Sequence, residues 1–226
     1  MPLNAKTTNI PTNTGKILAN SVDLTKVIAN GVVVWEKQTQ IDLINATTIN
    51  NGGTFTYFPA SSGTIKSDNQ HFMSTSGGRT WIYSRHHSPC TEDGDTNQVI
   101  NRIAWSNIDL SSFSKIKLTY SIHAATSTDG YALVRLYLGA GNLTTNVVEG
   151  RATAQYYEDE EDKEDAVNDF DSSGTIELNI ASLTGNQNIT VNLFHEGQDA
   201  YQDGEGDWHS GYISEANLYI TKLELS

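Results

Sequence analysis

Cysteine, basic residues and long apolar runs are scarce in this chain, and each shortage excludes a class of structure. Cys90 is the single cysteine among 226 residues, so neither an intramolecular disulfide nor a zinc site built from several thiolates can form. No apolar run reaches the roughly 18 residues that a membrane span needs, and the first residues lack the apolar core of a secretory signal. We therefore expect synthesis in a cytoplasm and no membrane insertion.

Basic residues number 14 against 27 acids, which gives a formal net charge of −13. Within residues 1–40, four lysines face one aspartate and one glutamate, so the negative charge belongs to the rest of the chain. A surface of this sign repels phosphate backbones, and without a basic patch binding gains nothing from counterion release. Nucleic acid is therefore not an expected partner.

Catalytic signatures are also missing. The sequence has no G-x-S-x-G elbow, no phosphate-binding loop and no H-E-x-x-H. Cys90 follows Pro89 in a polar segment that does not look like a nucleophile. We expect a protein that is not an enzyme and has no cofactor; the enzymatic alternative, a glycan depolymerase, requires two carboxylates about 5 to 10 Å apart in a cleft.

What the sequence does contain is strand periodicity. In residues 115–123, apolar side chains alternate with polar ones, which is the pattern of a half-buried antiparallel strand. The same alternation occurs in residues 131–139, 175–180, 188–194 and 216–225. In the last of these, the apolar positions change parity between Ile220 and Leu223, which predicts a bulge near Thr221.

The order of these segments predicts the fold class. Residues 124–130 join the first two strands, and we expect those strands to form a hairpin. Weaker strand candidates lie at 54–58, 79–84 and 99–105, and no segment has a sustained helical repeat. The chain should be all-β, with a small N-terminal hairpin module followed by an antiparallel two-sheet β-sandwich of the jelly-roll kind.

The N-terminal hairpin is the sharpest local signal. In KVIANGVVVWEK, residues 26–37, Asn30 and Gly31 lie between two β-branched runs, and Asn-Gly readily takes the positive φ angles of a type I′ turn. A stretch rich in Asn, Thr and Gly follows. We therefore divide the chain into a hairpin module at 1–42, a connector at 43–54 and a sandwich at 55–226.

The first 40 residues resemble the N-terminal segments of bacteriophage virion proteins, in which a lysine-valine-x-x-asparagine-glycine-x-x-valine-tryptophan pattern recurs. The resemblance implies a virion structural protein, namely a capsid decoration, a head fibre or a tail accessory protein. Its expected partners are other virion proteins and further copies of itself, with a trimer as a fair guess. The surface that would dock to the virion consists of Val27, Ile28, Val32, Val34 and Trp35.

Residues 105–226 resemble jelly-roll carbohydrate-binding modules, through a Ser-x-Phe phrase before a long strand and a last strand that closes the chain. This resemblance implies an alternative function, a host-glycan receptor-binding domain of a tail fibre or tail tip. A further alternative is a cytosolic β-protein unrelated to viruses.

Aromatic and acidic residues in HEGQDAYQDGEGDWH, residues 195–209, suit sugar contact, because C–H groups stack on rings and carboxylates accept hydroxyl protons. The candidate glycan-binding residues are Tyr201, Asp207, Trp208 and His209, although Trp208 could instead pack over the sandwich edge. A second candidate patch contains Trp81, Tyr83, Tyr156 and Tyr157.

Three acidic segments and a histidine pair complete the candidates. Two short loops with glycine could hold calcium through Asp93 and Asp95, or through Asp203 and Glu205, although an Asp-capped turn is the commoner explanation of such loops. Residues 158–171 carry nine acids and should form a solvated loop. Adjacent His86 and His87 would face opposite sides of a strand, so we expect surface or loop positions rather than a shared metal.

Overall fold

The computed structural model contains strands, turns and short connections, and no helix among the residues it describes. Those residues are 17–19, 22–24, 26–29, 32–36, 40–44, 53–59, 69–88, 98–126, 131–155, 166–197, 201–202, 208–209 and 212–226. The all-β fold class expected from the sequence is confirmed.

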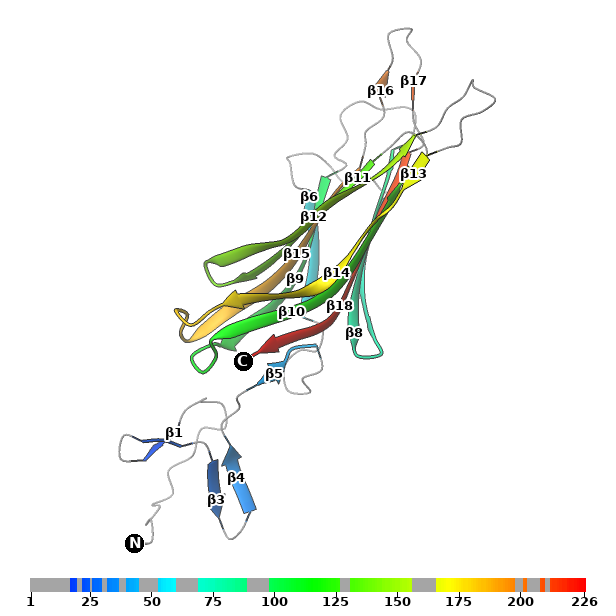
Figure 1. The fold of residues 1–226 in the computed structure, drawn as a ribbon. Helices are drawn as coiled ribbons and strands as arrows, with labels where there is room; N and C mark the ends of the chain where they lie inside the picture. The colour runs from blue at the N-terminus through cyan, green and yellow to red at the C-terminus, as the bar shows by residue number, and fades with distance from the viewer. Residues whose placement is uncertain are drawn as a thin grey trace.

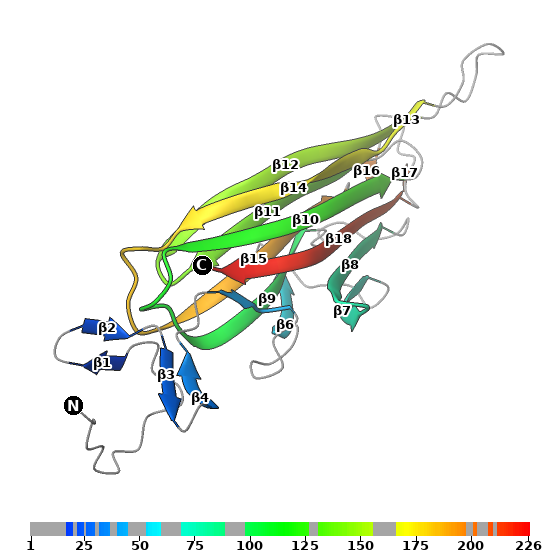
Figure 2. The same cartoon turned by 60° about the horizontal axis from the view of Figure 1, so that its bottom comes forward.

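Two antiparallel sheets pack face to face as a sandwich (Figures 1 and 2). The first, called here the β10 sheet, runs in the order β14 (Phe170–Asn179), β10 (Lys115–Thr126), β18 (Tyr212–Leu225), β8 (Arg79–Ser88) and β7 (Gln70–Ser76), with β5 (Ile41–Asp42) beside β18. The second, the β11 sheet, runs β13 (Ala166–Asn168), β12 (Leu143–Gln155), β11 (Tyr131–Ala140), β15 (Asn186–Gly197), β9 (Gln98–Asp109) and β6 (Thr54–Pro59).

The core follows from the alternation along each strand. On β10, every second side chain is buried, and β11 and β15 show the same pattern toward the opposite sheet. Because successive side chains of a strand point to opposite faces, one apolar face from each sheet fills the interior. The fully buried aliphatic residues of these three strands are Ile116, Leu118, Ile122, Val134, Leu136, Leu138, Ile189, Val191 and Leu193.

The expected hairpin between residues 115–123 and 131–139 is wrong. Both strands exist, but β10 pairs with β14 and β18, whereas β11 pairs with β12 and β15 in the other sheet. Their apolar faces meet across the core instead of lying side by side in one sheet. Alternation predicts which face of a strand is buried, but it does not say which strand is the hydrogen-bonded neighbour.

The bulge expected near Thr221 is confirmed. Thr119 of β10 lies opposite Lys222, while the next residue, Tyr120, lies opposite Ile220, so Thr221 is the extra residue. The inserted residue restores Leu223 and Leu225 to the buried face.

Several strands were missed, β7 and β12 among them, and one expected loop is partly a strand. β7 and β12 lie at or next to a sheet edge, where half-exposed side chains blur the alternation. Within the expected acidic loop at 158–171, β13 and the first residues of β14 are strands, while residues 158–165 lie outside the described part.

The N-terminal segment forms two short hairpins. β1 (Ile17–Ala19) pairs with β2 (Val22–Leu24), and β3 (Lys26–Ala29) pairs with β4 (Val32–Glu36). Ala29 lies opposite Val32, so the two residues between them, Asn30 and Gly31, join the strands as the Asn-Gly pair predicts. Figure 1 shows these strands beyond the end of the sandwich at which β5 lies.

Residues 41–44, at the expected junction between module and connector, take part in the sandwich. β5 pairs with the end of β18, and the Leu43 N–H donates to the Leu223 carbonyl at 2.8 Å. Leu43 is fully buried and Ile44 nearly so. The division into a module at 1–42, a connector at 43–54 and a sandwich at 55–226 stays a prediction, but Leu43 and Ile44 belong to the core.

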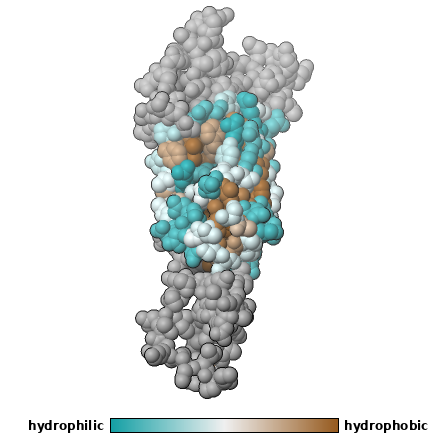
Figure 3. Space-filling view, turned by 90° about the vertical axis from the view of Figure 1, so that its left-hand side faces the viewer, coloured by the Kyte–Doolittle hydropathy of each residue, from teal (hydrophilic) through white to brown (hydrophobic). Residues whose placement is uncertain are grey.

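The edge of the sandwich between β12 and β14 is lined by partly buried apolar side chains that pack against the core. They are Leu143, Val147, Val148, Phe170, Ile176 and Leu178. Figure 3, which views the left-hand side of Figure 1, shows hydrophobic surface between hydrophilic groups over the described sandwich.

We expect Leu118→Ala to lower the free energy of unfolding by about 3 kcal/mol, because it removes a fully buried side chain and leaves a cavity in a packed core. The matched control is Ser121→Ala, an exposed position on the same strand, which should change stability by less than about 0.5 kcal/mol. Urea unfolding followed by tryptophan fluorescence measures both. Equal losses in the two variants would contradict the described core.

Candidate functional site

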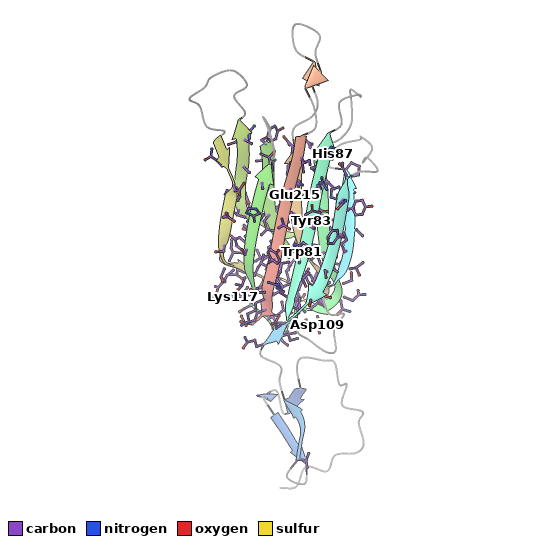
Figure 4. All side chains as sticks on the ribbon, turned by 90° about the vertical axis from the view of Figure 1, so that its right-hand side faces the viewer. Trp81, Tyr83, His87, Asp109, Lys117 and Glu215 are labelled. Atoms are coloured by element: carbon purple, nitrogen blue, oxygen red, sulfur yellow. The ribbon has the colours of Figure 1, made fainter. Side chains whose placement is uncertain are left out.

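Aromatic side chains gather on the outward face of the β10 sheet, where β7, β8 and β18 lie side by side. On β8, Trp81 and Tyr83 alternate with Thr80, Ile82 and Ser84, which are fully buried, so the two rings point away from the core. Figure 4 shows Trp81 and Tyr83 on this face, with Glu215 of the neighbouring strand.

The neighbouring strands add one ring each. Tyr219 of β18 lies between two buried residues and directly opposite Trp81, and Phe72 of β7 lies opposite Tyr83. Phe72 is 40% exposed, which is unusual for so large an apolar side chain. We call Phe72, Trp81, Tyr83 and Tyr219 the aromatic face.

The four rings contact one another in a continuous group. Trp81 and Tyr219 are nearly parallel, with centroids 6.0 Å apart and an interplanar angle of 7°. Phe72 lies 5.2 Å from Trp81, edge to face, and 5.1 Å from Tyr83. Packing of this kind holds each ring in one orientation and lowers the conformational entropy that a ligand would otherwise have to remove.

Polar groups fix the rings further. The Trp81 indole N–H donates to Asn217 Oδ1 at 3.0 Å, and the Tyr83 hydroxyl donates to Glu215 Oε1 at 2.7 Å. Arg85 Nε lies 3.7 Å from the same carboxylate oxygen. The aromatic face is therefore bordered by an amide, a carboxylate and a guanidinium.

A cation lies over one of the rings. The Arg79 guanidinium is 5.3 Å from the centroid of the Tyr219 ring, a cation–π distance, and Arg79 is exposed. The Arg79 side chain therefore lies over one face of the Tyr219 ring.

This arrangement raises the pKa of the Tyr83 phenol. Burial, followed by the hydrogen bond to Glu215 and the charge of Glu215, raises the pKa of Tyr83 to about 12, while Arg85 lowers it. Partial burial disfavours the phenolate, and a carboxylate that accepts the phenol proton favours the neutral form. Tyr83 is therefore a fixed hydrogen-bonding group at neutral pH and has no role as a base.

Beyond the rings, the same face continues as polar side chains across β10 and β14. Asn217 lies opposite His123, which lies opposite Asp171, and the His123 Nδ1 and Asp171 Oδ1 atoms are 2.9 Å apart. Tyr219 lies opposite Ser121, which in turn lies opposite Ser173. One row of residues thus runs from an aromatic side to a polar side of the sheet.

Stacking surfaces bordered by hydrogen-bonding groups suit ligands that have both apolar and hydroxyl-rich faces. The described residues contain no group of three or more His, Cys, Asp or Glu side chains placed to hold a metal ion. Nor does any helix in the described part have the length and apolarity to cross a membrane.

The sequence placed Trp81 and Tyr83 in one patch, and the structure brings them together. Their proposed companions Tyr156 and Tyr157 lie outside the described residues. Phe72 and Tyr219 were missed, although one signal was available: Leu218 and Ile220 were expected to point inward, which places Tyr219 outward. Nothing in the sequence paired β18 with β8.

The other candidate site residues stay predictions. Tyr201 lies on β16 (Tyr201–Gln202), and Trp208 and His209 form β17 (Trp208–His209), which pairs with it. This pairing places Tyr201 opposite His209. The remaining candidates lie outside the described residues, namely the glycan candidate Asp207 and the calcium candidates Asp93, Asp95, Asp203 and Glu205.

The expectation that His86 lies at the surface is wrong. His86 is 3% exposed and points into the sandwich, whereas His87, on the other face of β8, is half-buried. The reason is that β8 has a partner strand on each side and the second sheet beneath it.

No protein-family model matches the chain, and no curated protein matches it. Among solved structures, similar chains include a carbohydrate-binding module studied for specific mannan recognition, at 10% identity and a TM-score of 0.31, covering 83% of this chain and 95% of that one. Another is the N-terminal cellulose-binding domain of Cellulomonas fimi β-1,4-glucanase C, at 12% identity and a TM-score of 0.28, covering 75% and 86%. A third is a chain of infectious bursal disease virus, at 12% identity and a TM-score of 0.22, covering 77% and 40%.

We expect Glu215→Gln to lower the pKa of Tyr83 from about 12 toward the ordinary 10, without reaching it, because burial is the larger cause and remains. Titration of the tyrosine ring carbons by NMR measures the change. Glu177→Gln, an exposed change on β14 of the same sheet, is the control and should leave Tyr83 unaffected. An unchanged pKa of Tyr83 in Glu215→Gln would contradict the hydrogen bond.

Proposed function

We propose that this protein is a non-catalytic, carbohydrate-binding β-sandwich that takes its ligand on the aromatic face. The observation that carries the proposal is the nearly parallel pair of Trp81 and Tyr219, joined by the exposed Phe72. A sugar ring presents C–H groups on its faces and hydroxyl groups around its edge. Rings that lie on a sheet surface supply the stacking, and the groups beside them supply the hydrogen bonds.

The shape of the site favours an extended ligand. The aromatic face spans three adjacent strands, and the polar row continues across two more. Such a surface contacts several units of a glycan chain in succession. A single small molecule would contact only one or two rings, with most of its surface left in water.

The charge of the molecule favours a neutral glycan. The chain carries a formal net charge of −13, and Glu215 and Asp171 border the proposed site. A polysaccharide that carries a carboxylate or sulfate on each unit would be repelled over its length. Hydroxyl groups, in contrast, can donate to these carboxylates and accept from Arg85 and Asn217.

We expect Trp81→Ala and Tyr219→Ala each to weaken binding of a neutral glycan at least about tenfold, because each removes a central stacking ring. The protein is first tested on an array of neutral and acidic glycans, and affinity for the best binder is then measured by titration calorimetry. Far-ultraviolet circular dichroism checks that each variant is folded.

Tyr137→Ala is the matched control for Tyr219→Ala. Tyr137 alternates with buried residues of β11 and so lies on the outward face of the other sheet. This control should bind like the parent protein. Equal losses in both tyrosine variants, or a parent protein that binds no neutral glycan, would overturn the proposal.

The N-terminal hairpin favours a second function, docking of the protein to a virus particle. We propose that β3 and β4 provide the apolar docking surface predicted from Val27, Ile28, Val32, Val34 and Trp35. The supporting observation is Val32, which follows the turn of the hairpin and is 64% exposed. The two proposals are compatible, since a docked particle protein can display a glycan-binding face.

We expect Val32→Asp to reduce the amount of the protein that co-purifies with virus particles from its source, because it places a charge in an apolar contact. Co-sedimentation followed by quantitative mass spectrometry measures the amount. Thr144→Asp, an exposed change on β12, is the control. A wild-type protein that does not sediment with particles, or a Val32→Asp variant that sediments equally well, would contradict docking.

A further inference from the structure

Three histidines meet inside the sandwich, directly beneath the aromatic face. His71 comes from β7, His86 from β8 and His195 from β15 of the opposite sheet. The His86 and His195 rings have centroids 4.3 Å apart, and the His71 and His86 rings 5.4 Å apart. Ser84 joins them, with its hydroxyl 3.0 Å from His71 Nδ1 and 2.8 Å from His195 Nδ1. We call these four residues the histidine cluster.

The hydrogen bonds require neutral rings. The Ser84 hydroxyl has one proton, so it donates to one of the two Nδ1 atoms and accepts from the other. His86 Nε2 lies 3.1 Å from the His195 carbonyl and must donate to it. A proton added to the ring that accepts from Ser84 would turn both Nδ1 atoms into donors toward the same oxygen, so the Ser84 hydroxyl proton would lose its acceptor.

No counter-ion faces the histidine cluster from the described residues of the elements packed around it. β6 presents Tyr57, whose ring is 5.1 Å from that of His71, β9 presents the buried Asn101, and β18 presents the buried Ser214. β11 presents the apolar Ala132 and Val134. The nearest charged groups along the chain, Arg85 and Glu196, occupy the outward positions of β8 and β15, where each has a partner.

Burial lowers the pKa of His71 to about 4. Burial also lowers the pKa of His86 to about 3, an effect opposed by the hydrogen bond to the His195 backbone and reinforced by the nearby His71. Burial, with the nearby His86 and His71, also places the pKa of His195 well below its ordinary 6.5. We call the state in which β7 and β8 have separated from the opposite sheet the opened state, and the described structure the closed state. Because the histidines have ordinary pKa values in the opened state and lowered ones in the closed state, the opened state binds more protons below pH 6.5. The stability of the closed state is full above pH 6.5 and is lost as the pH falls toward the lowered pKa values.

Two of the three strands that carry histidines of the cluster, β7 and β8, have features that favour their release. β7 is an edge strand that pairs with β8 alone. The inner face of β8 consists of four buried residues, namely Thr80, Ile82, Ser84 and His86, of which three are polar. The inner face of β10 is apolar over the same length. Opening β7 and β8 therefore exposes little apolar area compared with opening β10.

We propose that the histidine cluster makes ligand binding acid-sensitive, because protonation of its rings releases β7 and β8 from the opposite sheet. Phe72 follows His71, and Tyr83 precedes Ser84, so the released strands carry three of the four rings of the aromatic face with them. The loss of ligand rests on the proposed function, whereas the strand opening does not. A glycan bound near neutral pH would be released in a mildly acidic compartment.

The test is hydrogen–deuterium exchange of the full chain without ligand between pH 7 and pH 5, corrected for the intrinsic pH dependence of exchange. If one histidine becomes charged on opening, the opening constant of β7 and β8 amides rises about 15-fold from pH 6.5 to 5, and further for each additional histidine. Amides of β11 and β12 are the internal control and should not change. Opening constants of β7 and β8 that are independent of pH, or that rise together with those of β11 and β12, would overturn the proposal.

His86→Gln removes one titrating ring and keeps an amide that can donate to the His195 carbonyl. It should make the rise of the opening constant between pH 6.5 and 5 about 15-fold smaller than in the parent protein. His123→Gln, on the outward face of β10, is the matched control and should retain the full dependence. If His86→Gln does not fold, the pH profile of the parent protein still decides the question.

Binding of mannohexaose and cellohexaose across the same pH range separates the two proposals. Loss of affinity in parallel with β7 and β8 opening supports both. Opening of β7 and β8 in a protein that binds neither of these nor any other neutral glycan of the array overturns the proposed function alone. Binding that persists while the strands stay closed at pH 5 overturns the acid sensitivity alone.

Discussion

The pairing of β8 with β18 sets the position of both the aromatic face and the histidine cluster beneath it. Its register places Trp81 opposite Tyr219 on the outer face and His86 opposite Ser214 on the inner face. Because side chains alternate along a strand, a slip of one residue would bury the aromatic rings and expose the histidines. The surface that we propose for binding and the polar interior beneath it are therefore set by the same backbone hydrogen bonds.

The sequence predicted those parts of the fold whose signal is local. β10 and β18, with the bulge at Thr221, could be read from the parity of apolar residues, because each buries one face against a packed core. The pairing of β10 with β14 and β18, in place of β11, could not, because strands in both sheets carry the same alternation. Partner choice depends on loops and on the closure of the whole sandwich, which a single strand does not encode.

The same limit explains which residues of the candidate site could be predicted from the sequence. Trp81 and Tyr83 are two residues apart, so their shared face follows from strand geometry alone. Tyr219 and Asn217 reach them from more than 130 residues away, and the Trp81–Asn217 hydrogen bond is a product of the fold. The burial of His86 could not be predicted for a related reason. Two adjacent histidines are typical of an exposed segment, and His86 is buried only because β8 has a strand on each side and a second sheet beneath it.

The two halves of the sandwich interior differ in polarity, and this difference connects stability with the proposed function. Beneath β10 the core is built from aliphatic side chains, whereas beneath β8 it contains Thr80, Ser84 and three histidines, several of whose polar atoms have no hydrogen-bond partner among the described residues. Buried polar groups without partners reduce stability, so the fold must be held mainly by its aliphatic half. The aromatic face is carried largely by the weaker half. The acid-sensitive opening that we propose would therefore change the aromatic face without unfolding of the whole protein.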